Sequence, residues 1–432
     1  MPAEIVEPPP QSAAAHRASF FRQSGWLMIA TVGAGMFMTA VHLLSRAMPK
    51  GEYGQFVAFL SVAMFIPAMP LQMVLAQQTA RALALHREHE LSGLIRAAWL
   101  GTFLVWLLAV AVVLLCQRTI TAQWSVTNPA AIWLMLPVVL FTVWLPMFYG
   151  VLQGQQNFLS MGWSMMLHGV GRVAICAIAV CVVHYSFPGR VNYYAPGMVL
   201  GVLGGLTLAL IVAIWPTRSL WLPSPQTFEW RSVLGQIIPL TLGFAAYQFL
   251  LTADTMLVRG CFSGAVSAYY GSAGTLARAS MWLVGPLAVV MFPKIVHAKA
   301  KAEKSDLMGV VLVGTLILAA CGAAGLWVLG PWVVHFMNGK DYVQPVSPLL
   351  HWYAWAVVPL SVANVLLNNL LARGQFKVVP ALFVLALGYG IALTRFHATP
   401  EMVIKTLTVA NTLLLAVCAY YTWGVRQPKT AG

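Results

Sequence analysis

The sequence has 432 residues, of which 60% are hydrophobic and only 8% are charged, whereas soluble proteins carry about 25% charged residues. So few charges exclude a water-soluble surface. The net charge of +14 would fit a nucleic-acid partner, but the basic residues stand singly or in short clusters between apolar runs. We therefore expect no nucleic-acid binding, and assign the basic residues to membrane orientation.

Residues 1–18 contain two glutamates and three consecutive prolines, which predicts a disordered cytoplasmic tail rather than a basic signal peptide. Apolar runs of roughly 20 residues then follow one another, and this length crosses a ~30 Å hydrocarbon core. We expect an all-α integral membrane protein with about 12 transmembrane helices, at residues 25–44, 55–76, 97–116, 130–152, 158–183, 195–215, 236–258, 264–292, 308–329, 347–371, 376–394 and 402–423.

Prolines within three of these spans predict departures from straight helices. Pro67 and Pro70 fall in the second span, Pro137 and Pro146 in the fourth, and Pro286 in the eighth. Proline removes a backbone donor, and neighbouring helices can satisfy the freed carbonyl groups in a membrane. We expect bent or broken helices at these places.

The sixth span has glycines at every fourth position, Gly197, Gly201 and Gly205. Small residues at this spacing let two helix backbones approach closely in lipid. We expect a tight helix contact on this face.

Basic residues between the spans predict the orientation of the chain. With twelve spans, the side that holds both termini carries nearly twice as many lysines and arginines as the opposite side. Cytoplasmic loops are enriched in basic residues, so we expect both termini in the cytoplasm. The run Lys294, Lys299, Lys301 and Lys304 lies on this side, where it would attract anionic lipid or capture a pyrophosphate lipid.

Matching motifs in the two halves indicate an internal repeat. Tyr53-Gly54 after the first span recurs as Tyr270-Gly271 after the seventh, and Gly154-Gln155 after the fourth recurs as Gly374-Gln375 after the tenth, at nearly the same offset. A duplicated six-helix unit places both copies parallel to each other. The predicted division is a tail at 1–18, an N-terminal bundle at 19–216, a cytoplasmic linker at 217–235, a C-terminal bundle at 236–424 and a cytoplasmic tail at 425–432.

Four segments of the chain resemble a known family. They are Ser45–Phe56, Gly150–Gln155, Asp254 with Ala268–Ala273, and Met291–Pro293. In these segments the sequence resembles the polysaccharide-transport flippases of the multidrug/oligosaccharidyl-lipid/polysaccharide exporter superfamily, which includes O-antigen flippases and the lipid II flippase. The resemblance implies two pseudo-symmetric six-helix bundles around a central cleft that opens alternately to each side, with helices 1, 2, 7 and 8 lining it.

Two arginines lie deep inside predicted spans, Arg172 in the fifth and Arg278 in the eighth. An intramembrane charge is costly and indicates function, and a guanidinium grips a diphosphate in a bidentate manner. We expect Arg278, Arg172 and Arg46 to bind an anionic substrate, although a buried ion pair would also explain Arg278. His168 lies one helical turn before Arg172, and is either a further substrate contact, a proton relay or a hydrogen-bonded core histidine.

Asp254 is the one acidic residue inside the predicted spans. A lone carboxylate there could bind a coupling cation, carry a proton, or neutralise Arg278 or Arg259. We retain Asp254 as the candidate ion-coupling residue, with the structural ion pair as the alternative.

The predicted function is alternating-access flipping of an anionic polyprenyl-diphosphate-linked oligosaccharide across the bacterial inner membrane, for O-antigen, exopolysaccharide or capsule synthesis. Polysaccharide polymerase machinery is an expected partner. The alternatives are a cation-coupled multidrug exporter of the same superfamily, which should carry several intramembrane acids, and a polytopic glycosyltransferase or polymerase, which needs positioned acids on an outer loop. The predicted outer loops offer few such acids, so we expect no enzyme. The chain has no Walker-A loop, so ATP is not the expected direct energy source, and its cysteines do not group with histidines, so we expect no bound cofactor or metal.

Overall fold

A computed structural model describes residues 13–222, 224–225, 230–283, 307–372 and 374–424 of the chain. The regular structure of these residues is entirely helical. Residues 1–12 of the predicted N-terminal tail (1–18), the predicted C-terminal tail at 425–432, the lysine run at 294–304 and Pro286 lie outside the described residues. The expectation of disorder was wrong for residues 13–18, which are helical. The all-α fold class is confirmed.

The first half of the chain forms seven α-helices and two short 3₁₀ segments. Their bounds are α1 (Ala13–Ala40), η1 (Val41–Ala47), α2 (Lys50–Phe65), α3 (Met69–Ala84), α4 (Glu88–Gln123), α5 (Ala130–Gly154), α6 (Phe158–Ser186), η2 (Val191–Tyr193) and α7 (Tyr194–Trp221).

The second half contains α8 (Trp230–Cys261), α9 (Gly264–Ala279), η3 (Ser280–Leu283), α11 (Leu307–Asn338), α12 (Lys340–Ala372), η4 (Phe376–Val378), α13 (Val379–Arg395), α14 (Pro400–Ala419) and the π-helical turn η5 (Tyr420–Gly424).

Eleven segments among the described residues are long and apolar enough to span a membrane. They coincide with eleven of the twelve predicted spans. The remaining one, 264–292, begins as α9 and η3, and its last part lies outside the described residues. Several helices run well past the predicted bounds, most clearly α4, which has 36 residues. A helix continues through the polar region on either side of the hydrocarbon core, so apolar runs underestimate its length.

The second span is broken where the prolines predicted a break. Helix α2 ends at Phe65, Ile66 is extended with φ −73° and ψ 120°, and α3 begins at Met69. The cause is Pro67, because the ring of a proline disfavours helical geometry at the preceding residue. The fourth span is not broken, since Pro137 and Pro146 lie within the continuous helix α5, which leaves a bend as the remaining expectation there.

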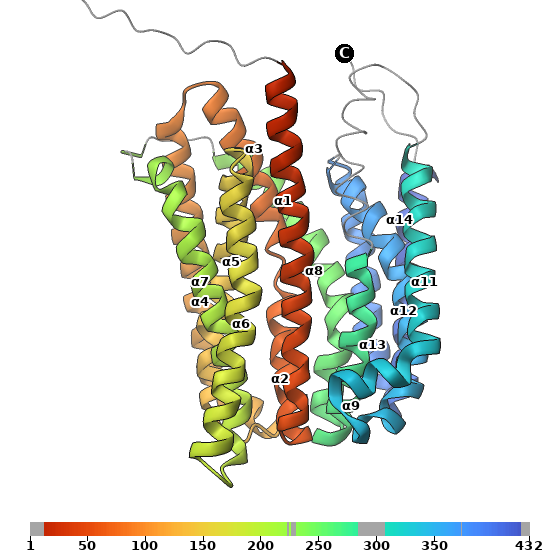
Figure 1. The fold of residues 1–432 in the computed structure, drawn as a ribbon. Coiled ribbons are helices and arrows are strands. Elements are labelled where there is room, and N and C mark those ends of the chain that lie inside the picture. Colours follow the sequence, from red (N-terminus) through yellow and green to blue (C-terminus); the bar gives the residue numbers. More distant parts are fainter. Residues whose placement is uncertain (1–12, 223, 226–229, 284–306, 373, 425–432) are drawn as a thin grey trace, which may run out of the picture.

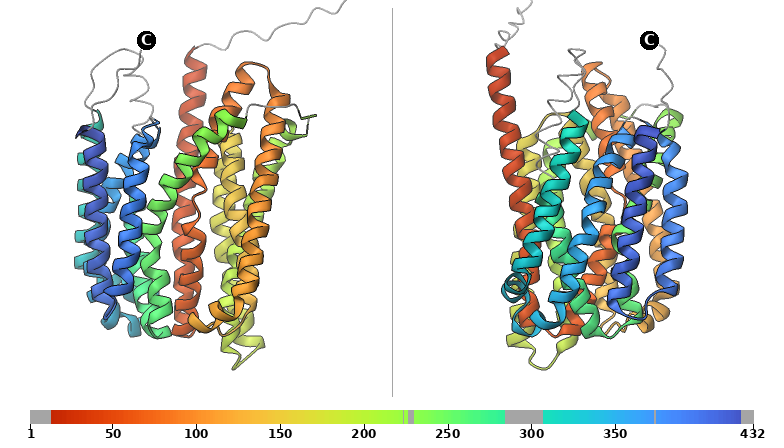
Figure 2. Two further views of the ribbon diagram at one scale, coloured as in Figure 1. Left: turned by 180° about the vertical axis from the view of Figure 1, so that it is seen from behind. Right: turned by 90° about the vertical axis from the view of Figure 1, so that its right-hand side faces the viewer.

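The helices form two groups that lie side by side (Figure 1), α1 to α7 in one and those from α8 onward in the other. In the first group α6 packs against α1 and α7, and in the second α12 packs against α11 and α14. The groups meet where α2 packs against α8 and α9, and where η1 packs against α11. Helix α1 begins and α14 ends at the same end of the molecule (Figure 2), as an even number of spans requires.

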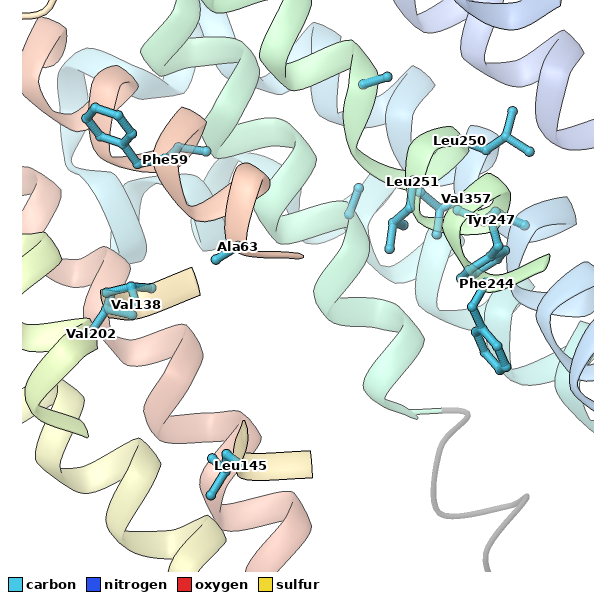
Figure 3. Packing of buried hydrophobic residues seen from close by; sticks show 14 of the residues in the cluster. Phe59, Ala63, Val138, Leu145, Val202, Phe244, Tyr247, Leu250, Leu251 and Val357 are labelled. Carbon is cyan, nitrogen blue, oxygen red and sulfur yellow. The ribbon is translucent and has the colours of Figure 1, made fainter. Parts of the chain in front are cut away.

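One cluster of buried apolar side chains extends through both groups of helices. Figure 3 shows part of it, including Phe59 and Ala63 of α2 with Phe244, Tyr247 and Leu250 of α8. Large apolar side chains also cover the outside. The most apolar stretch of α4 contains no buried residue, and most of its leucines and valines are exposed. Such a surface suits a lipid environment.

The predicted close contact of the sixth span is confirmed by the packing of α7 on α6. A methyl group added at Gly201 would lie 2.2 Å from the sulfur of Cys176, and one added at Gly205 would lie 2.6 Å from the carbonyl oxygen of His168. Only glycine permits this approach of the two backbones.

Candidate functional site

Asp254 and Arg278 form a buried ion pair between α8 and α9. The Arg278 Nη2 atom lies 2.9 Å from Asp254 Oδ1 and 3.2 Å from Oδ2, and it donates to the Thr255 hydroxyl at 3.1 Å. The Tyr270 hydroxyl donates to Asp254 Oδ2 at 2.9 Å. In this conformation Asp254 therefore neutralises Arg278, as the structural alternative predicted.

Tyr353 of α12 completes the cluster. Its hydroxyl bonds to both Asp254 and Arg278, and its ring centroid lies 5.3 Å from Arg278 Cζ. Gly274 makes room for this ring, since an added methyl group would lie 3.2 Å from it. Asp254, Arg278, Tyr270 and Tyr353, here called the α8–α9–α12 cluster, connect three helices. Sequence reasoning found the two charged members, but nothing in the sequence distinguishes Tyr353 from other aromatic residues.

Arg172 of α6 has a different environment. Its side chain is buried, with 5% of the residue exposed, and its Nε and Nη2 atoms have no hydrogen-bond partner. It lies within electrostatic reach of His168 on the same helix and of His42 on η1. The predicted proximity of His168 and Arg172 is thus observed, and His42, which sequence reasoning missed, joins them from a distant part of the chain.

Arg46 of η1 binds across the two groups of helices. Its Nη2 atom donates to the carbonyl oxygen of His335 at 2.6 Å and to that of Phe336, and its Cζ atom lies 5.9 Å from the Phe336 ring. These carbonyls belong to the last turn of α11, where a cation is favoured by the helix dipole. In this conformation the Arg46 guanidinium is hydrogen-bonded to protein carbonyl groups.

Asn338, the last residue of α11, strengthens the same connection. Its amide nitrogen donates to the Ser45 hydroxyl at 2.8 Å, and its amide oxygen accepts from the Ser272 hydroxyl at 2.7 Å. All three side chains are buried. We call Ser45, Arg46, Ser272 and Asn338 the η1–α11 cluster. It connects the two halves of the chain at the end of the molecule opposite the start of α1.

Further contacts close this end. Arg259 at the end of α8 donates to the carbonyl oxygens of Gly51 and Ser125, at 3.4 and 3.3 Å. Gly54 of α2 packs so closely on α9 that an added methyl group would lie 2.9 Å from the backbone nitrogen of Ala268. The repeated Tyr-Gly motifs thus lie on two helices, α2 and α9, that pack against each other.

A cavity of about 190 Å³ lies between the two groups of helices, beside the break between α2 and α3. Thr142 and Gln248 supply its polar side chains, and the rest of its lining is apolar: Ala63, Met64, Ile66, Pro67, Ala68, Met69, Pro146 and Phe244. Neither Arg172 nor Arg278 lines it. This cavity therefore does not bring the two predicted arginines together.

Residues 53–431 match the family described as lipid II flippase MurJ. The chain belongs to this family. The match supports the expected flippase superfamily but not specifically its O-antigen branch. Membership identifies a multi-pass membrane transporter, consistent with the eleven candidate spans. A comparison with curated proteins gives no match.

Solved structures show that this family fold extends over nearly the whole chain. A structure of lipid II flippase MurJ in an inward closed conformation aligns with a TM-score of 0.66 at 13% identity, covering 92% of this chain and 87% of that one. A mutant form of the Vibrio cholerae MATE transporter VcmN aligns with a TM-score of 0.59 at 15% identity, covering 95% of this chain and 98% of that one. A MOP superfamily transporter from Pyrococcus furiosus aligns with a TM-score of 0.55 at 13% identity, covering 94% of each chain.

Proposed function

We propose that this protein flips an anionic polyprenyl-diphosphate-linked saccharide across the bacterial inner membrane by alternating access. The observation that carries the proposal is the family match over residues 53–431. The candidate cargoes are lipid II and the lipid-linked units of O-antigen, exopolysaccharide or capsule. These share a diphosphate and a polyprenyl chain and differ in the sugar.

The distribution of buried charge favours an anionic cargo over a cationic drug. The buried acids of the described residues are Glu52 and Asp254. Glu52 accepts hydrogen bonds from Thr127 and from the backbone nitrogen of Ala195, and Asp254 is neutralised by Arg278. Neither carboxylate is free to attract a cation. A multidrug exporter of the same superfamily is therefore the less supported alternative.

The contacts between the two halves support alternating access. Polar contacts join them at the end that holds the η1–α11 cluster, whereas the cavity lies beside the α2–α3 break. We propose that this structure is closed towards the periplasm, with both termini in the cytoplasm as the basic residues predict. Opening on the periplasmic side requires that Arg46 and Asn338 release their partners.

The candidate substrate residues differ in how available they are. Arg46 and Arg278 are engaged by carbonyls and by Asp254, so each binds a diphosphate only in a conformation that frees it. Arg172 and His168 carry no such bonds in this conformation. We propose that Arg46 exchanges the α11 carbonyls for substrate phosphate when the bundles separate, because both are acceptors for the same guanidinium.

Complementation separates the possible functions. The protein is expressed in bacterial strains depleted of their lipid II flippase, in strains lacking an O-antigen flippase, and in strains lacking drug exporters. Rescue of either flippase-deficient strain supports the proposal and identifies the sugar class. Drug resistance without either rescue supports the multidrug exporter instead.

A further inference from the structure

Arg172 carries a buried charge whose stabilisation the proposed transport cycle does not explain. The residue is 5% exposed, and two of its three guanidinium nitrogens, Nε and Nη2, are buried without a hydrogen bond. A buried charge that lacks both a counter-ion and hydrogen bonds is strongly destabilising. A native protein avoids this cost by pairing the group, with a protein side chain or with a bound ion.

No protein carboxylate serves as the partner in the described part of the chain. The ion pairs found there are Arg87–Glu90 and Arg278–Asp254. Glu52, the one buried acid in the same half of the chain, is held by Thr127 and the backbone of Ala195 at the start of α7. The charge of Arg172 therefore remains uncompensated by protein groups.

Two histidines lie near Arg172. His168 lies one turn earlier on α6, and His42 on η1 is 4% exposed, each within electrostatic reach of the guanidinium. His42 Nδ1 is paired with the hydroxyl of Tyr53 at 3.0 Å, which fixes the orientation of the ring. An arginine and two imidazoles at the junction of η1, α6 and α7 supply several N–H donors and no carboxylate, a composition that suits an anion.

Helix α7 packs closely against the backbone and Cβ of Arg172. On the α7 side, a methyl group added at Gly205 would lie 2.8 Å from the Arg172 backbone nitrogen and 2.9 Å from its Cβ. The cavity of about 190 Å³ is elsewhere, between α2, α3, α5 and α8. A junction packed this closely suits a monoatomic anion better than a diphosphate carrying a sugar.

We propose that Arg172, with His42 and His168, binds one small monovalent inorganic anion of the size of chloride inside the N-terminal bundle. The anion supplies the missing counter-charge and links η1 to α6 and α7. This site is separate from the apolar cavity between the bundles, and its existence does not depend on which saccharide is transported.

The test is the melting temperature of the purified full-length protein in detergent, measured as chloride replaces gluconate at constant ionic strength. We expect a saturable rise of a few degrees, since a ligand that binds only the folded state stabilises it by mass action. The Arg172→Gln variant should lose this rise. Arg259→Gln is the matched control. Arg259 has the same exposed fraction, 5%, but its Nη1 and Nη2 atoms bond to backbone carbonyls, so this variant should retain the chloride response.

An equal chloride response in the wild type and Arg172→Gln overturns the proposal, as does a wild type that does not respond. A parallel titration uses inorganic pyrophosphate, and protection by pyrophosphate without protection by chloride contradicts the small-anion assignment. A second measurement covers the case in which Arg172→Gln does not fold. Wild-type crystals soaked in bromide should show anomalous scattering beside the Arg172 guanidinium, and its absence there refutes the site.

Discussion

The Arg278 Nη2 atom lies 2.9 Å from Asp254 Oδ1, inside the second group of helices and with both side chains buried. Tyr270 and Tyr353 bond to the same carboxylate, so the pair is almost fully hydrogen-bonded. A pair of this kind is neutral overall and fixes the spacing of α8, α9 and α12. This arrangement favours a structural role for Asp254 in this conformation over the binding of a coupling ion.

Asp254→Asn should destabilise the protein strongly, because it leaves Arg278 as an uncompensated buried charge. Removing one partner of a buried pair costs about 3–5 kcal/mol. Thermal unfolding in detergent measures the loss, and the double variant Asp254→Asn/Arg278→Gln should recover part of it. Residual transport per folded molecule near the wild-type level would exclude ion coupling by Asp254. Normal stability with abolished transport would instead favour coupling.

Tyr353→Phe should lower the free energy of unfolding by about 1–3 kcal/mol, since the hydroxyl that bonds to both charged groups is lost while the ring remains. Gly274 accommodates the ring in either case. Tyr389→Phe is a suitable control, because the Tyr389 hydroxyl is buried without a hydrogen-bond partner. If the two variants lost equal stability, the hydroxyl of Tyr353 would have no special part in the cluster.

Cross-linking Ser45 to Asn338 should hold the protein in the conformation described above. The two side chains are hydrogen-bonded at 2.8 Å and belong to opposite halves of the chain. In a background without the six native cysteines, Ser45→Cys/Asn338→Cys joined by a short cleavable thiol reagent should stop transport, and cleavage should restore it. Full transport by the cross-linked protein would show that the two halves need not separate here.

Gly205→Ala should be destabilising, by about 1–3 kcal/mol, because the new methyl group would lie 2.6 Å from the His168 carbonyl oxygen and force α7 away from α6. Gly388→Ala on α13 is the control, since a methyl group there meets no atom within 4 Å. Unfolding in detergent distinguishes the two. Equal stability of both variants would contradict the close approach of the two helices.

Features set by local sequence could be predicted, and so could the close approach of a helix at Gly201 and Gly205, but the partners in most tertiary contacts could not. The break at Pro67 follows from one residue acting on its neighbour, and the proximity of His168 to Arg172 follows from helical spacing. The bond between Ser45 and Asn338 joins residues 293 positions apart, and no local pattern indicates it.

For the same reason, the sequence indicated the charges inside the membrane but not which of them form pairs. Their existence could be read from the sequence, and so could the possibility that Asp254 neutralises Arg278. That the pair forms, and that Arg172 remains without a carboxylate, depends on how the helices pack. Tyr353 and His42 are ordinary members of their helices until the fold brings them beside the two arginines.

The most direct measurement of the central claim is translocation in proteoliposomes of defined orientation. Purified protein is reconstituted with lipid II or with a polyprenyl-diphosphate-linked O-antigen unit, and exposure of the sugar on the opposite leaflet is followed with an impermeant probe. We predict protein-dependent translocation of at least one of these lipids, blocked by the Ser45–Asn338 cross-link. Failure to move either lipid, together with uptake of a cationic dye, would contradict the account.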